Sequence, residues 1–442
     1  MAKDNNFNIQ TIGTATIPSP IHLDQMTGDS IYKFIEEKDR ILSDVTLQGF
    51  NTCLQNNEAP VCLEKAGPRE RIFFRPENTT AAIVTCGGLC PGINNVIRSL
   101  VMALHYFYGI KRIIGIPFGY EGLSPTSNHS LKELTPDMVN DIHEFGGTML
   151  GSSRGAQPVS EMVDMLENNK IDLLFAIGGD GTLKGANAIG DEIEKRQLPI
   201  SVIGIPKTID NDIDLIDKSF GFETAFDTAA PIIRDAHNEA TGAYNGVSIV
   251  KLMGRDSGFI AASAAIAMPV VNFVLVPEMA FDLYGPNGFF EALKKRLELK
   301  NHAVIVVAEG AGQHLFEKEK QITDASGNVQ HRDIGLLLKD KIKEYFDSQS
   351  IKTTIKYIDP SYIIRSAPAN ASDSVFCNRL AYHAVHGAMA GKTKFVVGMV
   401  NNQFVHLPIS KVVHQRKKID LAGEFWFAAL QSTGQPFSMV QS

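Results

Sequence analysis

The sequence contains few cysteines, and none stands at a spacing typical of a metal or redox motif. Their number is odd, and no two are separated by the two residues found in zinc and thioredoxin-like motifs: Cys53, Cys62, Cys86, Cys90 and Cys377. We therefore expect a protein of a reducing compartment.

Long apolar runs and an excess of positive charge are also lacking. No apolar run approaches the length that spans a bilayer, and residues 1–10 are polar, without the apolar core of a signal peptide. The formal net charge of −7 argues against nucleic-acid binding by phosphate neutralisation. We expect the one compact basic run, residues 414–418, to be a solvated helix face. The sequence thus predicts a cytoplasmic protein with no membrane or nucleic-acid partner.

The length and the pattern of apolar runs indicate an α/β fold. A chain of 442 residues corresponds to two or three domains. Eight nearly continuous apolar runs predict strands buried on both faces, as in parallel sheets covered by helices: residues 81–85, 112–117, 171–177, 201–205, 247–253, 273–277, 303–308 and 395–400. So many strands over more than 300 residues favour two α/β lobes with parallel-rich sheets.

The segments between and before these strands have different characters. Helices are expected at residues 94–104, 161–169 with Ser160 as the cap, 289–299, 333–346 and 373–390. Residues 317–332 have the composition of a surface loop or hairpin. Residues 1–80, with scattered prolines and little periodicity, predict an N-terminal extension without a core of its own.

Two glycine-rich loops follow predicted strands. Residues 85–92 read Thr-Cys-Gly-Gly-Leu-Cys-Pro-Gly, and residues 178–182 read Gly-Gly-Asp-Gly-Thr. Glycines at a strand-to-helix turn let a phosphate approach backbone N–H groups, and Asp180 would suit Mg²⁺. Each loop is also compatible with a tight structural turn, and lipid and NAD kinases carry the pentapeptide as well.

Residues 206–212, Pro-Lys-Thr-Ile-Asp-Asn-Asp, give the strongest signal. They combine carboxylate and amide oxygens, a hydroxyl and a lysine directly after a buried strand, where polar groups are costly without a purpose. If the segment is extended, Asp210 and Asp212 face the same way, so one could accept a hydroxyl proton while the other orients neighbouring groups. The alternative is a turn rich in Asp and Asn. Ligands of parallel sheets bind beyond the carboxyl ends of the strands, so both motifs would open onto one crevice, as phosphoryl transfer requires.

Further charged residues stand at strand ends and in loops. Arg255 is a candidate to neutralise phosphoryl charge, and Glu309 a candidate to accept sugar hydroxyls. Arg365 lies among apolar residues, and Arg154 lies in a flexible loop. For each arginine alone a structural ion pair is an adequate explanation; their recurrence favours function.

With these motifs in order, the chain resembles the phosphofructokinase family over residues 81–390. Residues 67–70 and the loop 85–92 are most similar to the long ATP-dependent enzymes of plants and trypanosomatids. The resemblance implies two Rossmann-like lobes, Mg²⁺, a homotetramer, and transfer of phosphate from ATP to the 1-hydroxyl of fructose 6-phosphate. It assigns residues 81–214 to a nucleotide-binding lobe completed by part of the C-terminal segment 390–442, and residues 215–389 to a sugar phosphate-binding lobe.

The resemblance also implies roles for individual residues. Asp210 would be the general base, assisted by Lys207, Arg154 and Arg255, and Asp180 would hold the metal. The nucleotide would contact Gly87, Gly88, Tyr120, Arg154, Gly155, Gly179, Asp180, Gly181 and Thr182. The sugar phosphate would contact Thr208, Ile209, Asp210, Met253, Gly254, Arg255, Glu309, Tyr362, Ile363, Ile364 and Arg365.

Two departures from the short bacterial enzymes bear on the donor and the acceptor. Those enzymes have glycine at the position of Lys207, and lysine there is typical of pyrophosphate-using relatives, which however have aspartate at the position of Gly181. The short bacterial enzymes also place an arginine from a neighbouring subunit near the position of Gly246. Lys251 or Lys356 would replace that contact here. A pyrophosphate-dependent enzyme is thus the first alternative, and a non-catalytic, ligand-sensing homologue the second.

Overall fold

The computed structural model describes residues 6–23, 33–316 and 331–441, which divide into two compact units. Unit 1 comprises residues up to Thr208, Ile213–Phe220 and Ala371–Gln415; unit 2 comprises Ile209–Asp212, Gly221–Asn370 and the residues from Arg416 on. The partition runs through the 206–212 motif. It also places helix α11 (Ala371–Met389) in unit 1, whereas the expected lobe boundary lay after residue 389.

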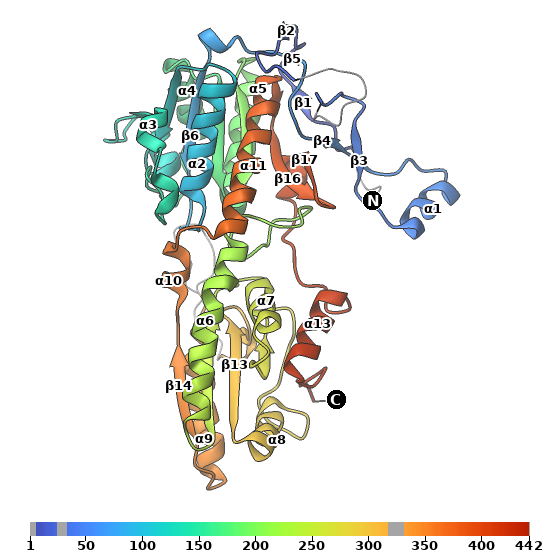
Figure 1. Ribbon diagram of the computed structural model, residues 1–442, viewed down its shortest axis with the longest axis vertical. Helices are drawn as coiled ribbons and strands as arrows, with labels where there is room; N and C mark the ends of the chain where they lie inside the picture. Colours follow the sequence, from blue (N-terminus) through green and yellow to red (C-terminus); the bar gives the residue numbers. More distant parts are fainter. Residues whose placement is uncertain (1–5, 24–32, 317–330, 442) are drawn as a thin grey trace. The chain divides into compact units, whose positions relative to one another are not determined.

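Unit 1 is built on a nine-stranded sheet in the order β3-β4-β17-β16-β10-β9-β6-β7-β8 (Figure 1). Its five central strands are parallel and its outer strands antiparallel. The strands are β3 (Arg40–Leu42), β4 (Cys62–Lys65), β6 (Thr80–Thr85), β7 (Arg112–Ile116), β8 (Lys132–Glu133), β9 (Leu173–Gly178), β10 (Ser201–Pro206), β16 (Phe395–Val400) and β17 (Gln403–Pro408). Every residue of β6, β9, β10 and β16 is buried, as the continuous apolar runs predicted.

Helices cover this sheet. Alternate residues of the strands, such as Ala82 and Leu174, pack with Leu166 of α4 (Val159–Asn168) and Leu183 of α5 (Asp180–Lys195). Helix α2 (Ile93–Met102) lies against α11 (Figure 1). The expected cap Ser160 is wrong. Helix α4 begins at Val159, so Ser160 lies inside the helix, and Pro158 stands at the cap position without a side-chain hydrogen bond. The remaining elements of unit 1 are β1 (Gln10–Thr11), β2 (Ile17–Pro18), α1 (Leu47–Gln55), β5 (Arg71–Ile72), α3 (Pro136–Val139), β15 (Lys392–Thr393) and α12 (Ile409–Val412).

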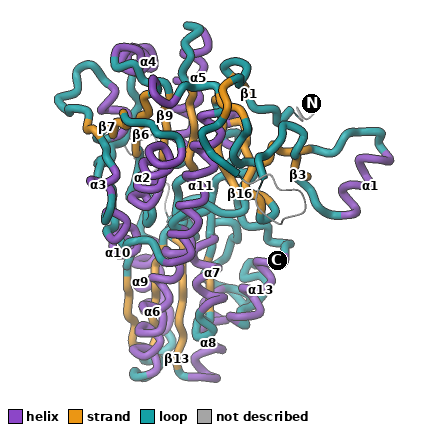
Figure 2. Tube along the Cα trace, turned by 45° about the horizontal axis from the view of Figure 1, so that its top comes forward, coloured by secondary structure: helices purple, strands orange, loops and turns teal. Residues whose placement is uncertain are grey.

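Unit 2 contains a four-stranded, fully parallel sheet in the order β12-β13-β11-β14. Its strands are β11 (Gly246–Leu252), β12 (Phe273–Leu275), β13 (His302–Ala308) and β14 (Thr354–Ile358). Its helices are α6 (Phe222–Thr241), α7 (Phe259–Ala267), α8 (Phe289–Lys300), α9 (Ile334–Ser348), α10 (Ser361–Ser366) and α13 (Glu424–Thr433). Helix α6 contacts β11, β13 and β14 and runs along the sheet (Figure 2). The expected loop at 317–332 lies almost wholly outside the described residues.

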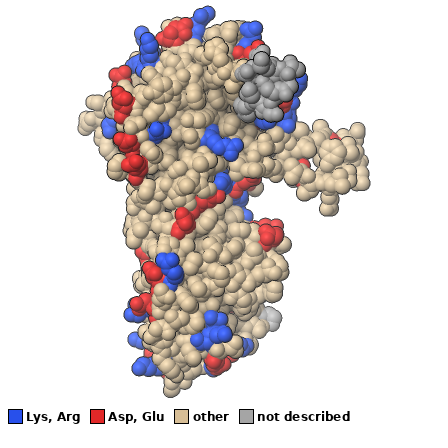
Figure 3. All heavy atoms as spheres, in the orientation of Figure 1, with Lys and Arg blue, Asp and Glu red and all other residues tan. Residues whose placement is uncertain are grey.

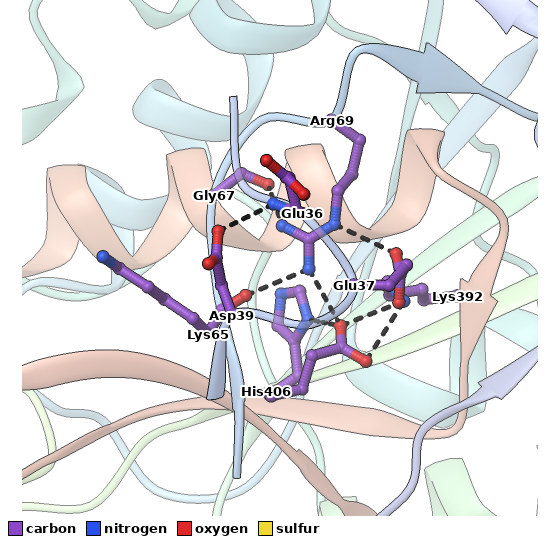
Figure 4. A network of polar contacts seen from close by, with 9 residues as sticks. Glu36, Glu37, Asp39, Lys65, Gly67, Arg69, Lys392 and His406 are labelled. Atoms are coloured by element: carbon purple, nitrogen blue, oxygen red, sulfur yellow. Dashed lines mark hydrogen bonds and ion pairs between the residues drawn. The ribbon is translucent and has the colours of Figure 1, made fainter. Parts of the chain in front are cut away.

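The N-terminal segment is not a detached arm throughout, because β3 and β4 extend the sheet of unit 1. A buried ionic network fixes them: the Glu64 carboxylate contacts Arg69 at 3.1 Å, Lys392 at 3.0 Å and His406 Nδ1 at 2.8 Å (Figure 4). Burial opposes ionisation of Glu64, but the hydrogen bond with His406 and the charges of Lys392 and Arg69 lower its pKa to about 2. By contrast, no residue of α1 is buried.

The surface carries both signs of charge. On the face drawn in Figure 3, Lys and Arg side chains are interspersed with Asp and Glu, and uncharged residues cover most of the area. No helix in the described part of the chain is both long enough and apolar enough to cross a membrane.

Candidate active site

In unit 1 the glycine loops gather at one edge of the sheet. Strand β9 is paired in parallel with both β6 and β10, so the three strands end side by side. At that edge the backbone N–H of Lys207 donates to the carbonyl of Gly178 at 2.9 Å. The structure therefore brings the loops 85–92 and 178–182 and the start of the 206–212 motif together, as their positions after strands predicted.

The loop 85–92 is held by hydrogen bonds from two other segments. Ser152 Oγ donates to the Gly87 carbonyl at 2.6 Å, and the Gly87 N–H donates to the Ser153 carbonyl at 3.0 Å. Lys207 Nζ donates to the Gly88 carbonyl at 2.6 Å. Gly87 has a φ of +87°, which favours glycine. Lys207 is buried, so one of its functions is to hold this loop.

The second loop forms the N-terminus of the sixteen-residue helix α5. A Cβ at Gly178 would lie 2.1 Å from Thr182 Oγ1, so only glycine fits there, whereas a Cβ at Gly181 would meet no atom within 4 Å. Asp180 is the first helical residue, and Oδ2 of its partly exposed carboxylate lies 2.9 Å from Lys184 Nζ. Backbone N–H groups and the helix dipole make this turn suited to a phosphate.

Other predicted nucleotide contacts differ in accessibility. Arg154 and Gly155 are exposed, in the segment whose residues Ser152 and Ser153 hold the first loop. The Tyr120 side chain is buried, and its hydroxyl donates to the Thr182 carbonyl at 2.7 Å. Tyr120 thus supports the start of α5 from beneath.

In unit 2 four acidic residues form a carboxylate cluster: Asp210, Asp212, Asp256 and Glu309. Burial, followed by the charges of the other three, raises the pKa of Asp210 well above its usual range, although the Arg255 backbone N–H donates a hydrogen bond to it. One carboxyl oxygen, Oδ1, is inaccessible to solvent while the residue as a whole is partly exposed. Ser257 Oγ donates to the Asp210 carbonyl at 2.8 Å.

The backbone between Asp210 and Asp212 differs from the extended segment considered in the sequence analysis. Asn211 between them has a left-handed φ of 54°, so the segment is not regularly extended. Asp212 nevertheless raises the pKa of Asp210 electrostatically. The expectation that both side chains face the same way required an extended segment, and that condition is not met.

Cationic side chains surround Glu309, which follows β13. Burial raises the pKa of Glu309, and the charges of His331, Arg255, Lys251 and Arg365 oppose that rise. This gathers two predicted sugar phosphate residues, Arg255 and Arg365, around a third. Clustered cations beside a hydroxyl-accepting carboxylate suit a sugar phosphate.

The lysines expected to replace a neighbouring arginine have partners within unit 2. Lys251 Nζ lies 2.8 Å from carboxylates of both Asp333 and Asp359, and Lys356 is 3.9 Å from Glu239. Lys251 Nζ also lies 6.0 Å from the centre of the Tyr357 ring. A direct substitution of either lysine for the arginine stays a prediction.

The remaining predicted sugar residues occupy loops and the short helix α10. Met253 and Gly254 follow β11, and Thr208 accepts a hydrogen bond from Ser219 Oγ at 2.6 Å through its carbonyl. On α10 Tyr362 and Ile363 are exposed, but Ile364 is fully buried, so its side chain belongs to the core. Ile209 is likewise buried.

Two residues near the cluster were not predicted. His331 lies 3.2 Å through Nε2 from the Arg255 carbonyl, at the end of a segment whose composition carries no site signal. Arg416 pairs with Asp256 and lies 3.7 Å from Asp212. The expectation that residues 414–418 are a solvated helix face is wrong, because they follow α12 without helical structure and Arg416 is a half-buried ion-pair partner. Only the positive charge of the run was a clue.

The donor set for a metal is small. Among the described residues no group of three or more His, Cys, Asp or Glu side chains is arranged to hold a metal ion. Mg²⁺ in phosphoryl-transfer sites is typically bound by one or two carboxylates together with phosphate and water. The partly exposed Asp180 fits that pattern, provided the flexible and exposed Lys184 side chain moves aside.

Comparison with known proteins identifies the family. The family model for phosphofructokinase matches residues 80–388. The chain belongs to the phosphofructokinase family. An ATP-dependent 6-phosphofructokinase of Borreliella burgdorferi is 51% identical over 98% of this chain and 98% of its own length. One from Amycolatopsis methanolica is 45% identical over 98% and 95%, and the chloroplastic ATP-dependent 6-phosphofructokinase 5 of Arabidopsis thaliana is 47% identical over 91% and 76%.

Solved phosphofructokinase structures share the fold. The pyrophosphate-dependent phosphofructokinase of Marinobacter aquaeolei matches with a TM-score of 0.67 and 21% identity, covering 81% of this chain and 92% of that one. The phosphofructokinase of Saccharomyces cerevisiae matches with a TM-score of 0.61 and 22% identity, covering 80% and 48%. The mixed α/β architecture with parallel-rich sheets predicted from the apolar runs is confirmed.

Proposed function

We propose that the protein is an ATP-dependent 6-phosphofructokinase, which transfers the γ-phosphoryl group of ATP to the 1-hydroxyl of fructose 6-phosphate and releases fructose 1,6-bisphosphate and ADP. The near full-length relatives of 45–51% identity carry this name. The observation that carries the proposal is the carboxylate cluster of unit 2, where burial and like charge raise the pKa of Asp210 toward the range of a general base at neutral pH.

In this proposal Asp210 accepts the proton of the 1-hydroxyl. Arg255 neutralises charge that develops on the transferring phosphoryl group. Glu309 accepts sugar hydroxyls, and Arg365 pairs with the 6-phosphate. Thr208, Ile209, Met253, Gly254, Tyr362, Ile363 and Ile364 complete the sugar phosphate contacts, the buried Ile209 and Ile364 through their backbones.

The donor is assigned to the glycine loops of unit 1. Gly87, Gly88, Gly179, Gly181 and Thr182 would offer backbone to the phosphates, with Arg154 and Gly155 from the neighbouring loop. Tyr120 supports this surface through Thr182. Mg²⁺, held by Asp180, would neutralise phosphate charge.

The open space at Gly181 favours ATP over pyrophosphate as the donor. A carboxylate at this position would project into that space and repel an α-phosphate, yet leave room for the shorter pyrophosphate. Lys207 carries less weight, because it is committed to the Gly88 carbonyl and its positive charge would suit a phosphate of either donor.

The assembly and location proposed are a homotetramer in the cytoplasm. The fully unburied α1, with Leu47 and Leu54 exposed, is an apolar surface that a neighbouring subunit could cover. Sedimentation equilibrium of the purified protein tests the tetramer.

A coupled assay tests the activity against its alternatives. The purified chain is incubated with fructose 6-phosphate, Mg²⁺ and either ATP or pyrophosphate, and fructose 1,6-bisphosphate is measured. Turnover with ATP supports the proposal. Turnover with pyrophosphate alone identifies the pyrophosphate-dependent enzyme, and binding without turnover identifies the ligand-sensing homologue.

A further inference from the structure

The C-terminal segment 416–419 is attached to the carboxylate cluster of unit 2. Arg416 is the residue at which the chain enters unit 2 for the last time. Its Nη1 contacts the Asp256 carboxylate directly and lies 3.7 Å from Asp212 Oδ2. The N–H of Lys417 donates to the Asp212 carbonyl at 2.9 Å. Backbone and side chain of this segment therefore both hold the 209–212 loop.

The partly buried Glu278 ties the same segment to the loop 254–258. Glu278 Oε1 accepts hydrogen bonds from the Ile419 N–H at 2.9 Å and from the Gly258 N–H at 3.1 Å. That loop in turn contacts Asp210 through the Arg255 N–H and through Ser257 Oγ. Three segments far apart in sequence thus form one assembly around Asp210.

Arg416 adds positive charge beside the carboxylates of this assembly, in addition to the cationic side chains near Glu309. The groups whose charge raises the pKa of Asp210 are Asp212 from its own loop, Asp256 from the loop 254–258 and Glu309 from the end of β13, all acidic. Arg416 contacts two of these three. The Arg416 side chain is 30% exposed and that of Asp212 is 12% exposed, so solvent screens the pair only partly.

We propose that Arg416 is a positioning residue for phosphoryl transfer: it holds Asp256 and Asp212 in place and offsets their charge, and so sets the pH at which Asp210 can take the hydroxyl proton. The inference rests on the proposed function. It assigns Arg416 no contact with either substrate. Its effect is transmitted through the two aspartates, so a loss of Arg416 changes kcat and its pH profile more than either KM.

The pH profile of kcat in the coupled assay tests this role. Replacing Arg416 with Met removes the charge but keeps the length, and should move the acidic limb to higher pH by about half a unit or more. Asp256→Asn removes a negative charge that faces Asp210 and should move the limb to lower pH. Arg416→Lys retains the charge and should keep the limb near its wild-type position. In the double variant R416M/D256N the upward shift caused by R416M should shrink, because one of the charges that Arg416 offsets is gone.

The control is Lys418→Met, which removes an exposed cation from the same segment and should leave the limb unchanged. A merely structural role would lower the melting temperature or kcat without shifts of opposite sign. An unmoved limb in R416M, or shifts of the same sign in R416M and D256N, overturns the inference. If R416M does not fold, the pH profiles of R416K and D256N decide. A displaced acidic limb in R416K, or an acidic limb at its wild-type position in D256N, overturns the inference. Absence of ATP-dependent turnover in the wild type would instead contradict the proposed function.

Discussion

Asp210 meets two opposing requirements. A general base must be unprotonated to accept a proton, yet a carboxylate of ordinary pKa is too weak a base for a sugar hydroxyl. Burial and the neighbouring acids raise its pKa, while the Arg255 N–H limits the rise. In the proposed mechanism, the environment of this one side chain therefore sets the pH range of the reaction.

Replacing Asp210 with Asn tests its role as base. We expect kcat to fall by about 10²–10⁴-fold, the usual contribution of general base assistance, with little change in fructose 6-phosphate binding. Steady-state kinetics and calorimetry measure the two quantities. Asp214→Asn, in the same segment but outside the cluster, is the matched control. Near wild-type kcat in D210N would remove the assignment.

In our proposal the preference for ATP over pyrophosphate depends on Gly181. We expect kcat/KM for ATP to exceed that for pyrophosphate at least about tenfold, which corresponds to about 1.4 kcal/mol. Gly181→Asp should reduce ATP use sharply without unfolding the protein, because a side chain at this helix N-terminus meets no atom within 4 Å. Gly181→Ala, which adds no charge, should have a small effect. Lys207→Gly should weaken catalysis by releasing the Gly88 carbonyl but keep the preference for ATP. If the wild-type enzyme used pyrophosphate but not ATP, Lys207 rather than Gly181 would be the residue that determines the donor.

We propose that Arg365 contacts the 6-phosphate of the acceptor, fructose 6-phosphate. Losing a charge-assisted hydrogen bond costs about 1.5–3 kcal/mol, so Arg365→Ala should raise KM for fructose 6-phosphate about tenfold or more. The KM for ATP should change far less. Arg365→Lys, which keeps the charge, should lose less affinity. A larger effect on the ATP KM than on the sugar KM would place Arg365 on the donor side.

At the scale of elements, strands made of continuous apolar runs could be predicted, and strands whose apolar pattern is short or interrupted could not. The eight apolar runs all correspond to strands, because strands buried on both faces consist of uninterrupted apolar residues. Strand β17 was missed because the fully buried His406 interrupts its apolar pattern. The hydrogen-bond partner of His406 is Glu64 on β4, 342 residues away in sequence. Patterns of neighbouring residues cannot predict such a contact.

That pairing makes β4 sensitive to acid. The folded-state pKa of Glu64 is about 2, below its ordinary value of 4.5, so its stabilisation is present above pH 4.5 and is lost as the pH falls toward 2. Glu64→Gln should cost about 3–5 kcal/mol near neutral pH, because it leaves buried cationic partners uncompensated. Chemical denaturation at several pH values measures this, with the exposed Glu70→Gln as control. Equal losses in the two variants would contradict the network's role.

At the scale of the whole molecule, two lobes were expected from the sequence, but not every residue at which the chain passes from one unit to the other. The boundary between Thr208 and Ile209 lies inside one motif. It arises because Asp210 and Asp212 contact the segments 254–258 and 416–419, which no sequence pattern connects. Sequence motifs suggested the glycines and carboxylates of the proposed site, whereas Arg416 and His331 belong to no motif.

Two histidines of unit 1, whose pKa values are lowered by burial, should determine how the stability of the fold depends on pH. Burial, reinforced by neighbouring cationic groups, lowers the pKa values of His383 and His386 to about 3. Their neutral forms stabilise the fold fully above pH 6.5, and this contribution is lost as the pH falls from 6.5 toward 3. The melting temperature should therefore drop through this range. The variant H383N/H386N should show a shallower drop, whereas the exposed His414→Asn should follow the wild type. Parallel curves for all three would exclude these histidines as the cause.

Gly246, at the start of β11, limits how this enzyme can evolve. A Cβ there would stand 2.1 Å from the backbone oxygen of Ala240, so no other residue is accommodated without moving the end of α6. The short bacterial relatives place an arginine near this position. An arginine at residue 246 itself is not accommodated here by a single substitution. The turn after α6 would have to be rebuilt first.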